Sequence, residues 1–309
     1  MVSTVSNFVS LSPRILARLQ AGELTHQQTD AFLDFLEEVN REFMQHRIIQ
    51  QNPYCEWFAT GQASDAELRH FIQQFSVFSN WFLKAALLRV MNAPNLEQHR
   101  ASREILLNEL GVIYRKPNPN DKNDQQLNDE EKDRQGDPEL VGTEGTVDGG
   151  TYRFRANHFE WMVGVGESIG MKFEDLGKRH HGRPKTLFFV DELARLYGNE
   201  DAQIAEGASF AVENWAAAGF WQQIEDGLLR LKQTRYPQLR LAFFTWHNRV
   251  EAQHAGHTME ELEEVFFRED FDREKFFHGG REVLEAVAAF WDGLQDDKVT
   301  RFRDDKVQG

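Results

Sequence analysis

Residues 243–262 read FFTWHNRVEAQHAGHTMEEL and place three polar side chains at the spacing of one helix face. His247, Glu251 and His254 occupy positions i, i+4 and i+7, so a helix projects them from the same side. Phe243 and Phe244 share that side, which therefore faces a core. Burying an unpaired carboxylate costs several kcal/mol or more. The pattern therefore predicts a ligand for the three side chains, and imidazole together with carboxylate suits Fe, Mn or Zn.

In each of three other helical segments, one polar side chain lies among apolar residues at helical spacing. Glu213, within GASFAVENWAAAGF, has apolar residues at i−3, i+4 and i+7. Glu109, within ASREILLNELGVI, has apolar pairs on both sides, and His158, within RFRANHFEWMVGV, has aromatic and aliphatic neighbours at helical spacing. Together with the first triplet they give three carboxylates and three histidines as predicted metal ligands: Glu109, His158, Glu213, His247, Glu251 and His254.

Helical periodicity dominates the rest of the chain. Capping boxes at Ser64–Glu67 and Thr25–Gln28 each open a helix. No segment shows strand alternation over several residues, and no internal repeat is found. The sequence predicts an all-α fold, a single domain over 1–309, with further helices over 97–111, 157–170, 186–197, 200–231, 237–257 and 273–294.

One long segment interrupts this pattern. Residues 114–151 contain almost no large apolar side chains and are rich in Asn, Asp, Gln, Glu and Gly. Such a composition cannot bury enough surface to offset the entropy of ordering the chain. We expect a long polar, mobile insertion between two helices of the domain.

Composition limits the classes of function. The chain has 309 residues, 40% of them hydrophobic, and a formal net charge of −15. That charge argues against a nucleic-acid partner and against docking on an anionic membrane. No apolar run approaches the roughly 20 residues that span a bilayer, and the N-terminus lacks the pattern of a secretory signal. We expect a cytoplasmic protein in which the single cysteine, Cys55, is a buried small apolar residue.

The six predicted ligands and their order resemble those of the haem-oxygenase-like di-iron oxidases and oxygenases. In that family one helical region supplies a Glu and a His, a second helix supplies a Glu, and a third supplies His-x3-Asp/Glu-x2-His. Glu109 with His158 matches the first region, Glu213 the second, and His247-x3-Glu251-x2-His254 the third. The resemblance covers nearly the whole chain. It implies a haem-oxygenase-like helical bundle that holds two Fe²⁺, with O2 as co-substrate and with Mn as an alternative at one position.

Two features depart from the family pattern. Glu109 and His158 are usually only a few residues apart, whereas here the polar segment 114–151 lies between them. Glu251 stands where many relatives have Asp, and its longer arm would alter the spacing or loading of the metals.

The resemblance also implies a class of reaction. Relatives are associated with N-oxygenation, desaturation and oxidative C–C cleavage. We therefore expect a non-haem di-iron oxidoreductase acting on a small organic molecule, for example one derived from an amino acid. An external electron donor and a homodimer are compatible with this. Two alternatives stay open: a metal-free oxidase like the pyrroloquinoline-quinone-synthase relatives, and a non-catalytic helical binding protein that docks its partner through 114–151.

Overall fold

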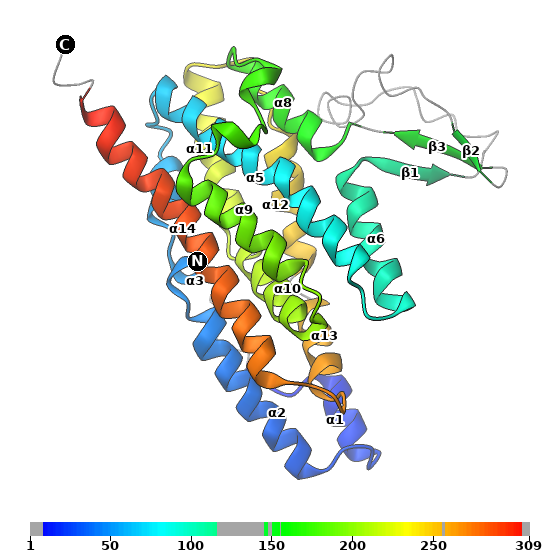
Figure 1. Cartoon of the computed structure of the whole chain (residues 1–309). Helices are drawn as coiled ribbons and strands as arrows, with labels where there is room; N and C mark the ends of the chain where they lie inside the picture. The colour runs from blue at the N-terminus through cyan, green and yellow to red at the C-terminus, as the bar shows by residue number, and fades with distance from the viewer. Residues whose placement is uncertain (1–8, 116–144, 148–149, 155, 255–256, 305–309) are drawn as a thin grey trace.

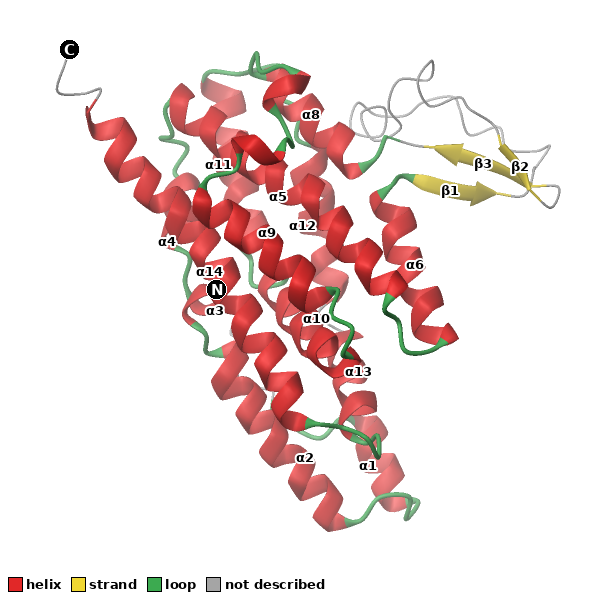
Figure 2. Cartoon of the chain, in the orientation of Figure 1, coloured by secondary structure: helices red, strands yellow, loops and turns green. Residues whose placement is uncertain are grey.

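The computed structural model describes residues 9–115, 145–147, 150–154, 156–254 and 257–304. These residues are mainly helical, which confirms the predicted all-α fold (Figures 1 and 2). The helices are α1 (Pro13–Gln20), α2 (His26–Val39), α3 (Arg47–Gln50), α4 (Pro53–Phe58), α5 (Asp65–Met91), α6 (Leu96–Glu109), α8 (His158–Ser168), α9 (Pro184–Tyr197), α10 (Ala202–Ala216), α11 (Phe220–Thr234), α12 (Ala242–His254), α13 (His257–Phe266) and α14 (Arg273–Asp304).

Both predicted capping boxes are present. The Ser64 hydroxyl accepts a hydrogen bond from the Glu67 amide at 3.3 Å and so opens the 27-residue helix α5. The Thr25 hydroxyl accepts from the Gln28 amide at 3.2 Å and opens α2. Each cap satisfies an amide that the first helical turn leaves without a partner.

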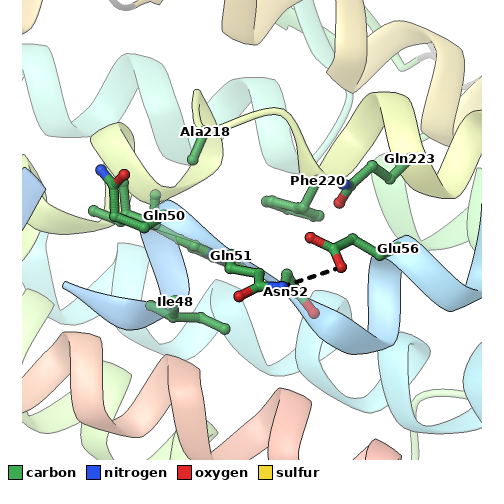
Figure 3. Close-up of a pocket in the computed structure, with 10 residues that line it drawn as sticks. Ile48, Gln50, Gln51, Asn52, Glu56, Ala218, Phe220 and Gln223 are labelled. Atoms are coloured by element: carbon green, nitrogen blue, oxygen red, sulfur yellow. Dashed lines mark hydrogen bonds between the residues drawn. The ribbon is translucent and has the colours of Figure 1, made fainter. Parts of the chain in front are cut away.

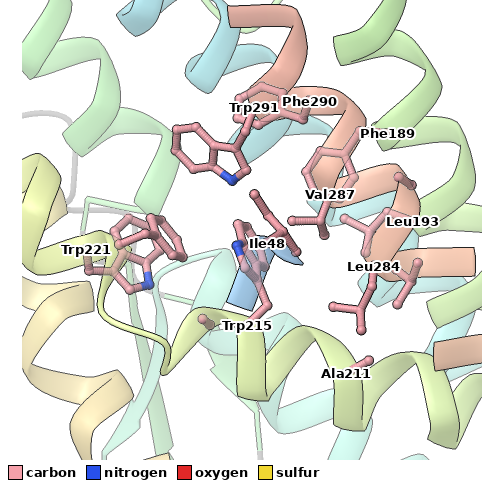
Figure 4. Close-up of a cluster of buried hydrophobic side chains, with 14 of the residues drawn as sticks. Ile48, Phe189, Leu193, Ala211, Trp215, Trp221, Leu284, Val287, Phe290 and Trp291 are labelled. Carbon is pink, nitrogen blue, oxygen red and sulfur yellow. The ribbon is translucent and has the colours of Figure 1, made fainter. Parts of the chain in front are cut away.

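The bundle is built around four long helices. α14 packs along α9 and α10, α9 packs in turn against α5, and α6 and α8 lie against α5 (Figure 1). Aromatic and aliphatic side chains fill the interior, as Figure 4 shows for the cluster that includes Phe189, Trp215, Phe290 and Trp291. The high Phe content of the sequence therefore serves core packing.

Two predicted helices differ from those observed. The helix predicted over 200–231 is two helices, α10 and α11, because Gly219 adopts φ +95°, which an L side chain rarely takes. The helix predicted over 237–257 begins only at Ala242, and α12 ends at His254 before α13 begins at His257. These breaks fix the directions in which the polar residues of α10 and α12 point.

A small antiparallel sheet was not predicted. Its strands β1 (Val112–Arg115), β2 (Gly145–Val147) and β3 (Gly150–Phe154) run in the order β1-β3-β2, with Val112 opposite Phe154. The predicted insertion at 114–151 therefore begins and ends in paired strands. Most of it, residues 116–144 and 148–149, lies outside the described residues, so its predicted mobility stays a prediction.

The described helices also bear on membrane insertion. Within the described part of the chain, no helix combines the length and the apolar character needed to cross a bilayer.

Candidate metal centre

His247 lies on α12 with its ring held by the helix backbone. Its Nδ1 is 2.6 Å from the carbonyl oxygen of Phe243, one turn earlier. A carbonyl can only accept, so Nδ1 carries the proton and Nε2 is the basic nitrogen of the neutral ring. The indole of Trp221 stacks on the imidazole, with centroids 4.6 Å apart and planes 19° apart. Metal-binding histidines are commonly oriented in this way, by a carbonyl on the nitrogen that does not bind.

His158 is the first residue of α8, and the cap of that helix sets its position. The Asn157 side chain accepts from the Glu160 amide at 2.8 Å, while the Glu160 carboxylate accepts from the Asn157 amide at 2.6 Å. His158 is only 4% exposed. The apolar pattern around His158 is therefore not that of one continuous helix, because Phe154 belongs to strand β3.

The structure brings three of the six predicted ligands together. His158 Nδ1 lies 2.9 Å from Glu109 Oε2. The rings of His158 and His247 have centroids 4.8 Å apart. Glu109 is the last residue of α6, so three separate helices, α6, α8 and α12, supply this group.

The small sheet explains how Glu109 and His158 meet although they lie 49 positions apart in the sequence. β1 begins three residues after Glu109 and pairs with β3, which ends four residues before His158. The two ends of the insertion are therefore held together by the sheet, and the contact between Glu109 and His158 forms despite it.

Glu213 lies on α10 and is half-buried. Its charge acts on a buried phenol, that of Tyr197 at the end of α9. Burial is the largest cause that raises the pKa of Tyr197 to about 12, while Arg89 lowers it and the charges of Glu213 and Glu109 raise it further. The charges of both carboxylates therefore act on the same phenol. Sequence alone does not single out Tyr197, because no spacing distinguishes it from a core residue.

Two of the three ligands in the predicted third-helix motif lie outside the described side chains. Glu251 and His254 belong to α12, but their side chains lie outside the described residues. Among the side chains that are described, no three acidic, histidine or cysteine groups stand close enough to hold one metal ion. The complete six-residue set therefore stays a prediction. The contacts observed within it are those of His158 with Glu109 and with His247.

Indole rings surround the two histidines. Trp161 and Trp246 lie 5.0 and 4.7 Å from the His158 ring, centroid to centroid. Trp221 was not predicted as a neighbour of His247. The chain turns at Gly219, and this turn, which places Trp221 against His247, is not visible in the helical pattern of the sequence. Cys55, by contrast, is fully buried, as predicted for a small apolar residue, and burial raises the pKa of its thiol well above the usual value.

The donor types in this group fit a metal centre of imidazole and carboxylate. Such donors suit Fe, Mn or Zn. The carbonyl of Phe243 and the carboxylate of Glu109 each occupy one ring nitrogen, which leaves Nε2 of either histidine as its basic nitrogen when the ring is neutral.

Comparison with models of known protein families gives no match, and comparison with curated protein sequences gives none. Solved structures do match. A CADD-like protein of unknown function from Nostoc punctiforme is 17% identical, with a TM-score of 0.56, over 87% of this chain and 98% of that one. A domain of unknown function with a haem oxygenase-like fold from Shewanella denitrificans is 15% identical, with a TM-score of 0.51, over 93% of this chain and 94% of that one.

These similarities establish the fold of the chain. The helical arrangement is that of the haem oxygenase-like fold, as the sequence resemblance implied. Both similar proteins are of unknown function, and a shared fold does not by itself determine function.

Proposed function

We propose that the protein is an iron- and O2-dependent oxidase or oxygenase of a small organic molecule. The observation that carries the proposal is the orientation of His247, whose Nδ1 is bound to the Phe243 carbonyl beside the His158–Glu109 pair. A histidine oriented only for packing would not need a second histidine beside it that is itself paired with a carboxylate. The haem oxygenase-like fold supports the proposal, because members of that fold include the di-iron enzymes that the sequence resembles.

Six residues would hold the metal ions: Glu109, His158, Glu213, His247, Glu251 and His254. Two Fe²⁺ bound there would supply the electrons that activate O2, and Mn is an alternative at one position. The protein's own part is to fix the ligands and to limit the access of water. The Phe243 carbonyl fixes one ring, and the indoles of Trp161, Trp221 and Trp246 cover the two histidines.

The decisive experiment measures iron binding rather than activity. Wild-type protein is loaded anaerobically with Fe²⁺, freed of excess metal and analysed for bound iron. We expect about two irons per chain in wild type and a loss of most of this iron in His247→Ala. His180→Ala is the matched control, because His180 is an exposed histidine of the loop before α9. Equal iron in wild type and His247→Ala would contradict the proposal.

A second measurement identifies the reaction. O2 uptake by the Fe²⁺-loaded protein is followed with amines, amino acids and fatty acids, with and without an external reductant. We expect one substrate class to accelerate uptake at least tenfold in wild type and not in His247→Ala. Substrate-dependent uptake by protein that binds no iron would instead support the metal-free oxidase.

A further inference from the structure

Four side chains around Phe220 and the cavity beside it carry buried N–H donors that have no acceptor. They are Nδ2 of Asn52 and Nε1 of Trp215, Trp221 and Trp291, and none has a partner among the described residues. The four side chains are 5%, 3%, 6% and 2% exposed. Buried polar groups nearly always have a hydrogen-bond partner, so a group of donors that lack one indicates an acceptor supplied from outside the chain.

The aromatic ring of Phe220 contacts the three tryptophans of this set. Trp215 stacks on it with centroids 4.6 Å apart and planes 7° apart, and Trp221 and Trp291 lie 4.6 and 5.4 Å from it. Figure 4 shows the indole nitrogens of Trp215 and Trp291 facing the space between these two side chains. The three indoles thus surround one ring between α10, α11 and α14, and Asn52, the N-cap of α4, lines the cavity on which Trp215 and Phe220 also border.

A small cavity opens beside this group. It has a volume of about 50 Å³ and lies between the connection from α3 to α4, the end of α10 and the start of α11 (Figure 3). Its lining includes Asn52, Trp215, Phe220 and Gln223, with Gln51 and Glu56 beside them. A volume of roughly 10–15 Å³ on this measure holds one water molecule, so the cavity has room for a ligand of a few heavy atoms.

The amide of Asn52 has a fixed orientation. Its Oδ1 accepts from the Cys55 backbone amide at 3.1 Å and so caps α4. Because a backbone N–H can only donate, the oxygen must face Cys55, and the Nδ2 donor must face the other way. The unpaired donor is therefore a consequence of the helix cap.

The charges of the residues that line the cavity limit the class of ligand that it can bind. None of the residues that line the cavity is basic. One lining residue, Glu56, is an exposed acid. Glu56 accepts only a long hydrogen bond, 3.4 Å, from Gln51. A simple anion would be repelled by this carboxylate, whereas a ligand that also carries a cation would be attracted to it.

We propose that this cavity binds a small zwitterionic amino acid. Its carboxylate would accept hydrogen bonds from Asn52 Nδ2 and Trp215 Nε1, and its ammonium group would lie near the Glu56 carboxylate. The site is separate from the candidate metal centre: Phe220 and Trp221 lie between the cavity and His247. Binding can therefore be measured on metal-free protein, and a failure here is distinguishable from a failure of the proposed iron chemistry.

The test is calorimetric titration of the metal-free full-length chain with L-alanine, propionate and ethylamine. L-alanine carries both charged groups, and the other two carry one each. We expect saturable binding of L-alanine, with propionate and ethylamine at least tenfold weaker. Absence of saturable binding by L-alanine would mean that water alone satisfies the donors, and the proposal would be overturned.

Three variants locate the site. Asn52→Asp keeps the capping oxygen but removes the Nδ2 donor, so we expect at least a tenfold loss of L-alanine affinity with an unchanged melting temperature. Asn95→Asp is the matched control, since Asn95 caps α6 through the same contact, 2.9 Å from the Gln98 amide. Glu56→Gln should weaken L-alanine and not propionate. Wild-type affinity in Asn52→Asp would place the ligand elsewhere and overturn the proposal.

Discussion

The phenol of Tyr197 illustrates how one buried residue reports on the electrostatics of the candidate metal centre. It is 1% exposed, and the guanidinium of Arg89 lies over its ring at 4.6 Å. Burial, together with the charges of Glu213 and Glu109, raises its pKa to about 12. The side chain therefore keeps its proton at any physiological pH and stays neutral in the field of two predicted metal ligands.

This raised pKa predicts a specific loss of stability in alkali. The pKa rises from the usual value of 10.0 to about 12, so the folded state holds the proton more tightly than the unfolded state does. The resulting stability is complete below pH 10 and is lost as the pH rises from 10 toward 12. At pH 11 the loss is about 1.4 kcal/mol.

Tyr197→Phe tests that value, because every other tyrosine is unchanged. We expect the variant to be less stable than wild type by about 1 kcal/mol at pH 8, where it lacks the hydroxyl hydrogen bond. Chemical unfolding at pH 8 and pH 11 should show this difference vanish or reverse at the higher pH. A difference in stability that is the same at both pH values would mean that the phenol has the same pKa in the folded and unfolded states.

At the scale of single residues, spacing alone selected three side chains that the structure brings into contact. His247 was selected because it shares a helix face with Glu251 and His254, and its contact with His158 is observed. Trp221 and Tyr197 were not selected, because an aromatic residue at an apolar position has the same pattern whether it packs in a core or faces a metal. Their roles come from contacts between helices, which no local pattern contains.

At the scale of the element, helix α8 depends on its cap. Asn157 and Glu160 form the reciprocal hydrogen bonds that begin the helix at His158. We expect Asn157→Ala to cost about 1 kcal/mol of stability and to weaken Fe²⁺ binding, because it loosens the residue that positions His158. Asn157→Ser, which restores a cap, should recover both. Fluorescence-monitored unfolding and anaerobic iron titration measure the two effects, and unchanged iron affinity in a destabilised Asn157→Ala would argue against His158 as a ligand.

Close packing of α10 on α14 depends on two glycines. A Cβ at Gly279 would collide with the backbone oxygen of Ile204, and a Cβ at Gly207 would collide with that of Phe276. Backbone cannot move aside as a side-chain tip can, so we expect Gly279→Ala to destabilise by about 2 kcal/mol, in spite of the helix propensity gained. Gly164→Ala on α8 is the control, because its Cβ would approach only the flexible tip of Arg240, at 3.2 Å. Thermal melting should therefore show a fall for the first variant and little change, or a rise, for the second.

Element boundaries were the part of the fold that sequence predicted least well. The 200–231 pattern continues through Gly219 because the apolar residues on either side keep a helical period, yet the backbone there takes φ +95°. The short strands were missed because β1 and β3 have only four and five residues, too few for an alternation to be recognised. Where capping residues stood at a predicted start, at Thr25 and Ser64, the boundary was correct.

At the scale of the whole molecule, the all-α fold was predictable because helix faces and caps agree with one another, and the haem oxygenase-like arrangement was implied by the family resemblance. The insertion 114–151 shows neither the helix faces nor the caps that predict the rest of the fold. The structure places its two ends together, since Arg115 lies opposite Thr151 in the sheet. A segment that leaves and returns at one point can be long without disturbing the core.

This geometry predicts that the insertion can be removed without loss of the candidate metal centre. Replacing residues 116–150 with Asn-Gly joins Arg115 to Thr151 through a two-residue turn of the kind that antiparallel pairs favour. Because β1 and β3 keep their register, Glu109 and His158 should stay in contact. We expect the shortened chain to melt within a few degrees of wild type and to bind the same amount of Fe²⁺. A shortened chain that melts normally but binds no iron would show instead that the insertion contributes to the metal centre, whereas full iron content would leave it free for another role, such as docking a partner.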